Sequence, residues 1–295
     1  MSDLEGYGKI YESTYWGDGR DNTIDWGIVY KDLGITTDAD YQAVLDRSTA
    51  LGYTAPSAAQ QELQNTLITD LKTAGVWDKL DLFYIFATDG DSDFATLNWK
   101  APSNFQATKV NSPTFTTDSG FSGDGSTAYL DTNFVIATDV SNYSQNNAST
   151  FTYFESDLSQ TDFAVYGARD DIDPIKSRNQ LRMRSTDYRP ALNDQRPIVS
   201  TDYRAQKWHH QKRTNSTEIQ TFLDSTNFTT YKFSTDIAGL DFSMRLLTLH
   251  LKNTSGTSNL FGSAEGTMKV FGIGEALDNT DLKDAIDTYL TAIAP

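Results

Sequence analysis

A short run of acidic residues is the nearest approach in this sequence to a pair of catalytic carboxylates. Glu155-Ser156-Asp157 is followed by Gln160. Glycoside hydrolysis needs two carboxylic groups on opposite sides of the sugar bond. Glutamine cannot donate or accept a proton, so position 160 does not supply the second group. The alternative is a strand end that enters a polar loop, and we predict no catalytic residues.

A second group of acidic residues alternates along the chain as calcium ligands do. Asp89, Asp91 and Asp93 have this spacing, but Phe94 and Lys100 stand where an EF-hand loop needs glycine and glutamate. An EF-hand is therefore excluded. A surface calcium site at these three aspartates and a plain aspartate-rich turn remain as the two interpretations, and no other cofactor is expected.

The positions of the three histidines in the sequence do not predict a metal site. His209 and His210 are adjacent, and adjacent residues of a strand point to opposite faces. They cannot grip one ion together in a simple strand. His250 lies in the apolar run from Leu246 to Leu251 and is interpreted as a core or edge residue.

Basic residues are concentrated in one region of an acidic chain. Ten of the 24 lysines and arginines lie between Lys176 and Arg213, although the net charge is −16. Arg178, Arg182 and Arg184 are spaced as on one strand face, and with Trp208 they would form a surface for an acidic partner. The alternative is that scattered arginines pair with Asp187, Asp194 and Asp202.

Composition limits the remaining classes of function. The acidic charge argues against nucleic-acid binding, since phosphates need basic partners. The absence of cysteine excludes disulfides and thiolate chemistry. The longest apolar run, 82–87, is too short to span a bilayer, and the first residues do not resemble a secretory signal. We expect no membrane insertion and folding in a cytoplasm.

Helical patterns flank the central part of the chain. Residues 37–76 read as a helical hairpin: Asp38 is a candidate N-cap, Gly52 a stop, Ser57 the start of a capping box and Gly75 the second stop. At the far end, Asn279 or Thr280 would cap a helix that runs through Leu290.

Between these helices the pattern is that of many short strands. Apolar or alternating stretches are separated by turns rich in Gly, Asn, Asp and Ser, which is typical of a sandwich or jelly roll. The expected strands are 82–87, 95–99, 115–116, 128–134, 150–155, 163–168, 181–184, 206–212, 218–223, 245–251 and 267–274.

The first 36 residues contain many aromatic residues without a period of 2 or 3.6. We interpret 1–36 as an extended arm, with a strand pair packed on the main domain as the alternative. Exposed aromatic side chains are costly unless they dock, so these residues are candidate partner contacts. They are Tyr7, Tyr11, Tyr15, Trp16 and Trp26.

Several segments resemble a module of bacteriophage and prophage structural proteins. The matching segments are Leu51-Gly52-Tyr53-Thr54-Ala55-Pro56-Ser57, 71–81, 97–100, 120–134, 270–277 and 281–283. In such proteins these segments are similar to parts of a concanavalin-like or laminin-G-like sandwich. The resemblance implies a virion or tail-associated protein, and residues 1–36 and 176–213 lie outside it.

Together these features predict a mainly β protein with a jelly-roll or concanavalin-like sandwich. The expected organisation is an arm (1–36), a helical hairpin (37–76) and a sandwich with a closing C-terminal helix (77–295). The predicted function is that of a non-enzymatic virion subunit, as a capsid decoration, head-fibre or tail-associated protein. Its partners would be other virion proteins and further copies of itself. A glycan-binding receptor-recognition module that contacts host surface glycans is the alternative, and a glycoside hydrolase is the third interpretation.

Overall fold

The computed structural model describes residues 11–12, 29–30, 37–172, 177–194, 198–224, 226–259 and 264–294. The chain divides into two compact units, Met1–Thr37 and Asp38–Pro295. In the first unit, β1 (Tyr11–Glu12) pairs antiparallel with β2 (Val29–Tyr30). No helix among the described residues is both long and apolar enough to cross a bilayer.

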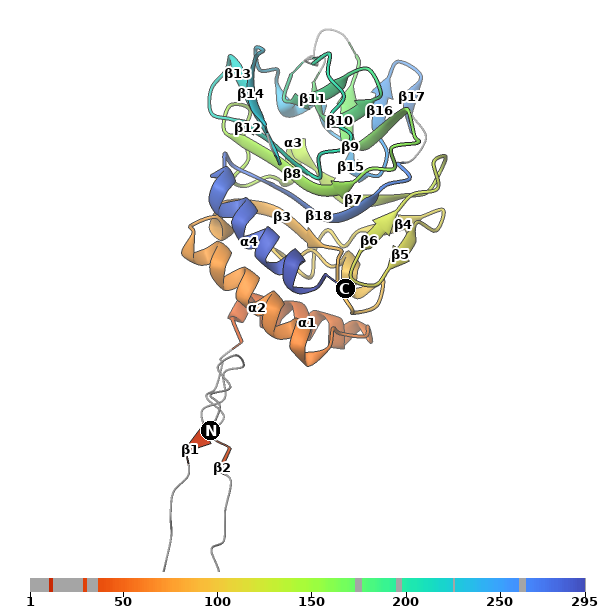
Figure 1. Ribbon diagram of the computed structural model, residues 1–295. Coiled ribbons are helices and arrows are strands. Elements are labelled where there is room, and N and C mark those ends of the chain that lie inside the picture. Colours follow the sequence, from red (N-terminus) through yellow and green to blue (C-terminus); the bar gives the residue numbers. More distant parts are fainter. Residues whose placement is uncertain are drawn as a thin grey trace, which may run out of the picture. The chain divides into compact units, whose positions relative to one another are not determined.

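The second unit has three layers: helices, one sheet against them, and a second sheet beyond (Figure 1). We call the two sheets the helix-side sheet and the distal sheet. The helices are α1 (Ala39–Leu51), α2 (Ala58–Thr73), α3 (Ile136–Asp139) and α4 (Asn279–Ala292), with 3-10 turns η1 (Trp77–Lys79), η2 (Phe94–Thr96) and η3 (Ile237–Gly239).

The helix-side sheet follows the order β14-β13-β12-β8-β18-β6-β5, and β3 also pairs with β18. Its strands are β3 (Leu80–Ile85), β5 (Thr114–Thr116), β6 (Gly120–Ser122), β8 (Ala148–Glu155), β12 (Trp208–Arg213), β13 (Glu218–Leu223), β14 (Asn227–Tyr231) and β18 (Thr267–Gly274).

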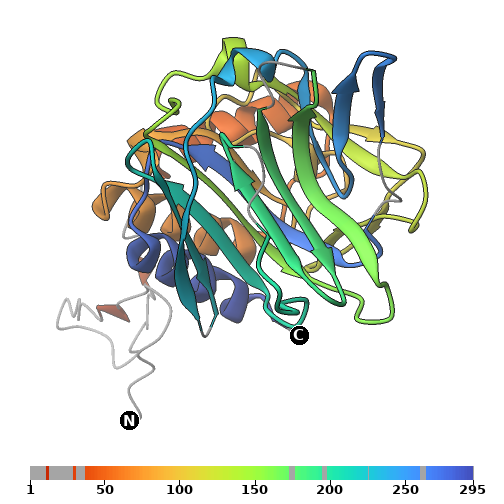
Figure 2. The same cartoon turned by 90° about the horizontal axis from the view of Figure 1, so that it is seen from above.

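The distal sheet follows the order β11-β10-β9-β15-β7-β4, and β16 pairs with both β9 and β17. Figure 2 looks onto this sheet. Its strands are β4 (Thr108–Val110), β7 (Tyr129–Val135), β9 (Asp162–Asp170), β10 (Arg178–Arg184), β11 (Tyr188–Leu192), β15 (Ser243–Leu246), β16 (His250–Asn253) and β17 (Gly256–Asn259).

Two hydrophobic cores hold these layers together. One lies between the sheets and includes Phe154, Phe163 and Phe271. The other lies between the helix-side sheet and the helices, where Phe151 and Trp208 are fully buried. Burying aromatic side chains on both faces explains how a chain with few aliphatic residues builds a stable interior.

The predicted fold class is confirmed: a mainly β protein, a two-sheet sandwich and a C-terminal helix. The helix boundaries also agree, because Asp38 and Ser57 accept hydrogen bonds from Asp40 N and Gln60 N at the N-termini of α1 and α2. The predicted caps of α4 are wrong by one residue. Asp278 caps this helix through the N–H groups of Thr280 and Asp281.

Two predicted strands are wrong. Residues 95–99 form η2 and a turn, because Asp91 accepts hydrogen bonds from the N–H groups of Asp93 and Phe94 and curls the chain. The run 245–251 is split into β15 and β16. Leu247 has φ 65°, a conformation that reverses the chain there and ends the first strand.

Candidate functional site

The arginines predicted to lie on one strand face do so on β10. Arg182 and Arg184 share Asp162, with N···O distances of 2.5 and 3.4 Å, as expected of residues two apart on a strand. Arg178 pairs with Asp171 at 2.6 Å. The side chains of Arg178 and Arg182 are only 8% and 10% exposed. These guanidinium groups are therefore committed within the distal sheet.

The predicted surface that combined these arginines with Trp208 does not form. Trp208 is fully buried on β12 of the helix-side sheet, where its Nε1 donates to Asn279 Oδ1 over 2.9 Å. Its ring packs 5.8 Å from that of Phe151. The arginines belong to the other sheet. The sequence pattern failed here because it did not show that α4 covers β12.

The alternative prediction for the basic region is confirmed. Arg184 and Arg189 pair with Asp187, Arg204 with Asp202 at 2.7 Å, and Arg213 with Asp194 at 3.7 Å. The last pair is fully buried on both sides, whereas the Asp202 side chain is 38% exposed. The concentration of positive charge is thus largely balanced by aspartates within the same region.

Asp89, Asp91 and Asp93 bind neighbouring segments of the chain through hydrogen bonds and an ion pair. Asp89 Oδ1 accepts from Ser57 N at 3.0 Å, and Asp91 Oδ2 from Thr54 N at 2.6 Å. Burial opposes the ionisation of Asp91, but N–H donors, first that of Phe94, outweigh it and lower its pKa. Asp93 pairs with Lys109 at 2.8 Å. In the described part of the chain no three such side chains are gathered as metal ligands, these aspartates included.

Glu155 is held as an anion between two lysines. Its Oε1 lies 2.9 Å from Lys207 Nζ and 3.3 Å from Lys269 Nζ. Partial burial raises its pKa, but the hydrogen bond to Lys207 and the charge of Lys269 outweigh burial and lower it. Gln160 Oε1 instead accepts from the backbone N–H of Glu265 at 3.0 Å. Glu155 therefore lacks the raised pKa expected of a catalytic acid.

The adjacent histidines face opposite sides of β12, as predicted. His209 stacks on Tyr188 at 5.8 Å, while His210 lies 3.1 Å from Asn279 Oδ1 beside α4. Burial lowers the pKa of each to about 4. Both are therefore neutral in the folded protein near pH 6.

This burial predicts a loss of stability at mildly acidic pH. The unfolded chain protonates these histidines near pH 6.5 and the folded chain near pH 4, so stability is lost as the pH falls through that window. The loss is about 3 kcal/mol per histidine at most. Urea unfolding at pH 7, 5.5 and 4.5 measures it, and His210→Gln should flatten the profile. A free energy of unfolding that is constant across the window would contradict this account.

The predicted arm residues lie almost entirely outside the described residues. This applies to Tyr7, Tyr15, Trp16 and Trp26, and of Tyr11 only the backbone pairing with Tyr30 is described. The docking role of these residues stays a prediction.

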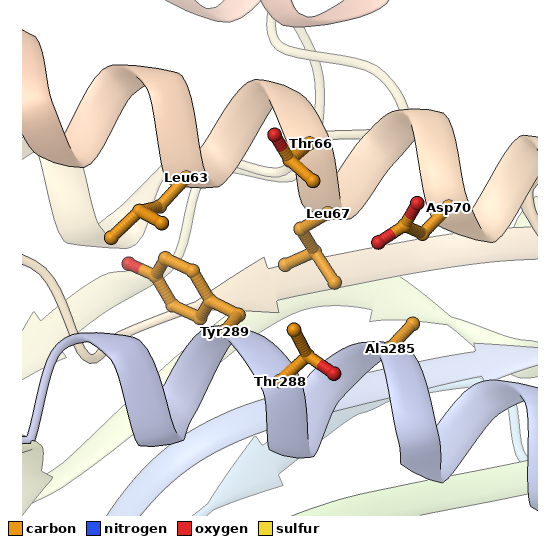
Figure 3. A pocket seen from close by; sticks show the side chains of 7 residues that line it. All are labelled: Leu63, Thr66, Leu67, Asp70, Ala285, Thr288 and Tyr289. Atoms are coloured by element: carbon orange, nitrogen blue, oxygen red, sulfur yellow. The ribbon is translucent and has the colours of Figure 1, made fainter. Parts of the chain in front are cut away.

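A shallow groove runs between α2 and α4 (Figure 3). Leu63 and Leu67 of α2 face Ala285 and Tyr289 of α4. The Tyr289 hydroxyl is directed inward and donates to Ala87 O at 2.8 Å. Thr66, Asp70 and Thr288 also line the groove, but its volume of about 20 Å³ is too small for a ligand, so we interpret it as the packing seam of the two helices.

The best candidate site is an open part of the helix-side sheet on β12, β13 and β14 (Figure 1). Lys212, Gln220 and Thr229 lie side by side across these strands, and Glu218 lies opposite Tyr231. Lys212 lies on the same face of β12 as Trp208 and His210. Helix α4 covers that face at Trp208 and His210. We call this surface, together with Phe233, the aromatic platform.

Two exposed rings dominate the aromatic platform. Tyr231 and Phe233 are 77% and 78% exposed, the highest values among the large hydrophobic side chains of the described residues. Residues two apart in extended chain share a face, about 6.6 Å apart. The backbone pairing continues through this point, because Lys232 N donates to Thr217 O at 2.7 Å. Tyr231 is the last residue of β14, and Phe233 follows it in a segment held by this bond and by the bond from Ser234 N to Ser216 O at 2.8 Å.

Polar side chains beside the rings are available to a ligand. Among the described residues, the side chains of Lys212, Glu218 and Gln220 make no hydrogen bond or ion pair with the rest of the protein. They supply an ammonium donor, a carboxylate acceptor and an amide that does both. Flat rings next to uncommitted hydrogen-bonding groups can bind a ligand that has an apolar face and a polar rim.

Sequence reasoning did not find this site. Strand β14 was not among the predicted strands. The aromatic residues predicted to contact a partner lay mainly within residues 1–36. One feature of the sequence could have revealed it. In the stretch 227–233 every second residue should face the same side, and on the side of the polar residues Asn227 and Thr229 the next two are the aromatic residues Tyr231 and Phe233.

No protein-family description matches the chain, and no curated protein matches its sequence. Solved structures match in fold. The binding domain of botulinum neurotoxin serotype D is 12% identical with a TM-score of 0.42, over 76% of this chain and 52% of that one. Domain 4 of AbnA, an arabinanase from Geobacillus stearothermophilus, gives 13% and 0.44, over 70% and 98%. Trypanosoma rangeli sialidase gives 11% and 0.45, over 78% and 39%.

The matched region spans about half of the toxin domain and less of the sialidase. At these identities the likeness concerns the fold alone. The class defined by the chain's own architecture is a two-sheet β-sandwich backed by helices on one face.

Proposed function

We propose that this protein is a non-enzymatic carbohydrate-binding module and that the aromatic platform is its glycan-binding surface. The observation that carries the proposal is the strong exposure of two aromatic rings only two residues apart, Tyr231 at the end of β14 and Phe233 just beyond it. The apolar C–H face of a sugar ring packs on such rings, and its hydroxyl groups bond to neighbouring polar side chains.

The polar residues of the platform determine which sugars fit. Lys212 lies opposite Gln220 on β12, and Glu218 is two residues before Gln220 on β13, so the platform offers both signs of charge and an amide. A neutral glycan with several hydroxyl groups uses all three groups as donors or acceptors. A strongly anionic glycan would meet Glu218 directly opposite Tyr231. We therefore propose neutral oligosaccharides as the ligand class.

The environment of Glu155 argues against catalysis. The one carboxylate that the sequence suggested, Glu155, is paired with Lys207 and Lys269 and has a lowered pKa. Sugar release by the wild-type protein that is lost in Glu155→Gln would overturn the non-enzymatic part of the proposal.

Removing the two rings should weaken binding strongly and leave the fold intact. A glycan that binds the wild type is first identified on an array. We expect the double variant Tyr231→Ala, Phe233→Ala to weaken the binding of this glycan by about 2 kcal/mol, roughly thirtyfold in Kd. Because both rings are exposed, the free energy of unfolding should change by less than about 0.5 kcal/mol for each. Isothermal titration calorimetry measures the affinity.

The matched control is Leu158→Ala. Leu158 is 57% exposed in the loop between β8 and β9, outside the platform. This variant removes exposed apolar surface elsewhere and should bind as the wild type does. An array with no hit for the wild-type protein, or equal affinities for all three proteins, would refute the proposal.

The sequence resemblance suggests the setting in which such a module works. We propose that it is exposed on a bacteriophage particle, assembled in the host cytoplasm, where recognition of host surface glycans would be useful. The resemblance at residues 71–81 and 120–134 supports this setting. Mass spectrometry of purified particles should find the chain, and its absence from them would contradict a virion role.

A further inference from the structure

Strand β14 is an outermost strand, and among the described residues no other strand pairs with its free edge. It pairs with β13 on one side, in a hairpin closed by the bond from Leu223 N to Thr226 O at 2.8 Å. Antiparallel pairs alternate between bonded and non-bonded residues. Phe228 and Thr230 are therefore the residues bonded to β13. The N–H and C=O groups of Asn227, Thr229 and Tyr231 point to the open edge.

Other edge strands of this protein carry features that discourage pairing with another chain. Strands β4 and β5 are three residues long, β4 contains Lys109, and Pro113 precedes β5. Strand β11 contains Pro190, and its edge is bridged by Val199 opposite Tyr188.

Strand β14 has none of these features. Its five residues, Asn-Phe-Thr-Thr-Tyr, include no proline, glycine or charge. Threonine and aromatic residues favour strands. An uncharged, β-prone edge of this length is a template for an added strand.

We propose that this edge pairs with β14 of a second copy of the chain, antiparallel about Thr229. In this register Thr229 lies opposite its own copy and Asn227 opposite Tyr231. The flanking charges are opposite in sign, because Lys232 follows the strand and Asp224 precedes it, with a 34% exposed carboxylate that also accepts from Lys207 N and Trp208 N. In this register Lys232 of one copy lies opposite Thr226 of the other, two residues from Asp224. The net charge of −16 disfavours close approach elsewhere, so an uncharged strand with opposite charges at its ends is the suitable meeting point.

Pairing in this register joins the two helix-side sheets into one. The two-fold axis is perpendicular to the sheet, so both aromatic platforms come to lie on the same face, next to each other. This consequence rests on the proposed glycan function, and the pairing itself does not. Two adjacent platforms would bind a multivalent glycan surface more tightly than either one alone.

Sedimentation equilibrium of the full chain without glycan tests the pairing. The wild type should have twice the monomer mass of 32.8 kDa. Thr229→Lys places two like charges directly opposite each other and should give monomers. The matched control, Thr116→Lys, adds the same charge to the exposed edge residue of β5 and should stay dimeric. A monomeric wild type, or an assembly that Thr229→Lys leaves unchanged, overturns the proposal.

Hydrogen exchange of the wild type gives a second test that needs no variant. The amides of Thr229 and Tyr231 should exchange slowly in concentrated protein and faster on dilution. Those of Phe228 and Thr230, bonded to β13, should be slow at both concentrations. Fast exchange of Thr229 in concentrated protein overturns the pairing. Because no sugar is present, failure of the glycan proposal leaves this result unaffected.

Discussion

Replacing Asp194 by alanine is expected to lower the free energy of unfolding by about 3 to 5 kcal/mol. Asp194 and Arg213 are both fully buried, with 3.7 Å between carboxylate and guanidinium. The variant leaves the Arg213 charge in the interior without its counter-ion. Urea unfolding monitored by circular dichroism measures the loss.

The geometry around Arg213 explains why it cannot leave the interior. Its Nε donates to Leu192 O at 2.9 Å, and its Nη1 donates to Lys232 O at 3.0 Å. The side chain thus joins the end of β11 to the chain after β14. Burial lowers the pKa of Arg213, and the charge of Asp194 opposes that effect.

An exposed pair of the same chemistry provides the control. Asp202 pairs with Arg204 at 2.7 Å, but its side chain is 38% exposed, so Asp202→Ala should cost less than about 1 kcal/mol. The double variant Asp194→Leu, Arg213→Met should be more stable than Asp194→Ala, since it removes both charges. Equal losses for Asp194→Ala and Asp202→Ala would mean that burial of the first pair is not important for stability.

Trp208→Ala is expected to cost about 3 to 5 kcal/mol, because it empties a large volume in the core under α4. The variant also removes the hydrogen bond from Trp208 Nε1 to Asn279 Oδ1, at the first residue of α4. The near-ultraviolet circular dichroism and the midpoint of urea unfolding should both change. Trp208→Phe keeps part of the packing, so its free energy of unfolding should lie between those of the wild type and of Trp208→Ala.

Tyr231→Ala is the control for this variant, since its side chain is 77% exposed and its removal leaves no cavity. The comparison separates the two interpretations of Trp208. A residue of a partner surface would tolerate alanine without loss of stability, as Tyr231 should. A stable Trp208→Ala protein would therefore contradict the core position.

Features that depend on local pattern could be predicted from the sequence. The apolar run 82–87 was expected to form a strand, and β3 (Leu80–Ile85) includes its first four residues, with residues 82–87 all 0% exposed. Asp38 and Ser57 were expected to start helices and do so. These predictions succeeded because capping and periodicity are decided by neighbours along the chain.

Features that depend on distant residues could not be predicted. Whether Trp208 faces solvent is decided by α4, some 70 residues later in the chain. The break at Leu247 is set by its bond to Val165 O at 2.7 Å, which the apolar run 245–251 does not reveal. The exposed rings of Tyr231 and Phe233 were missed because the local pattern does not show that the described helices leave this end of the sheet uncovered.

The central claim is that glycans bind to the aromatic platform on β12, β13 and β14. Amide chemical shifts of the labelled protein, recorded during titration with a neutral oligosaccharide selected on an array, test it most directly. We predict that the shifted signals gather on Lys212, Gln220, Thr229, Tyr231 and Phe233. Shifts that gather instead on the distal sheet around Arg178 and Arg182, with those of β14 unchanged, would contradict the account.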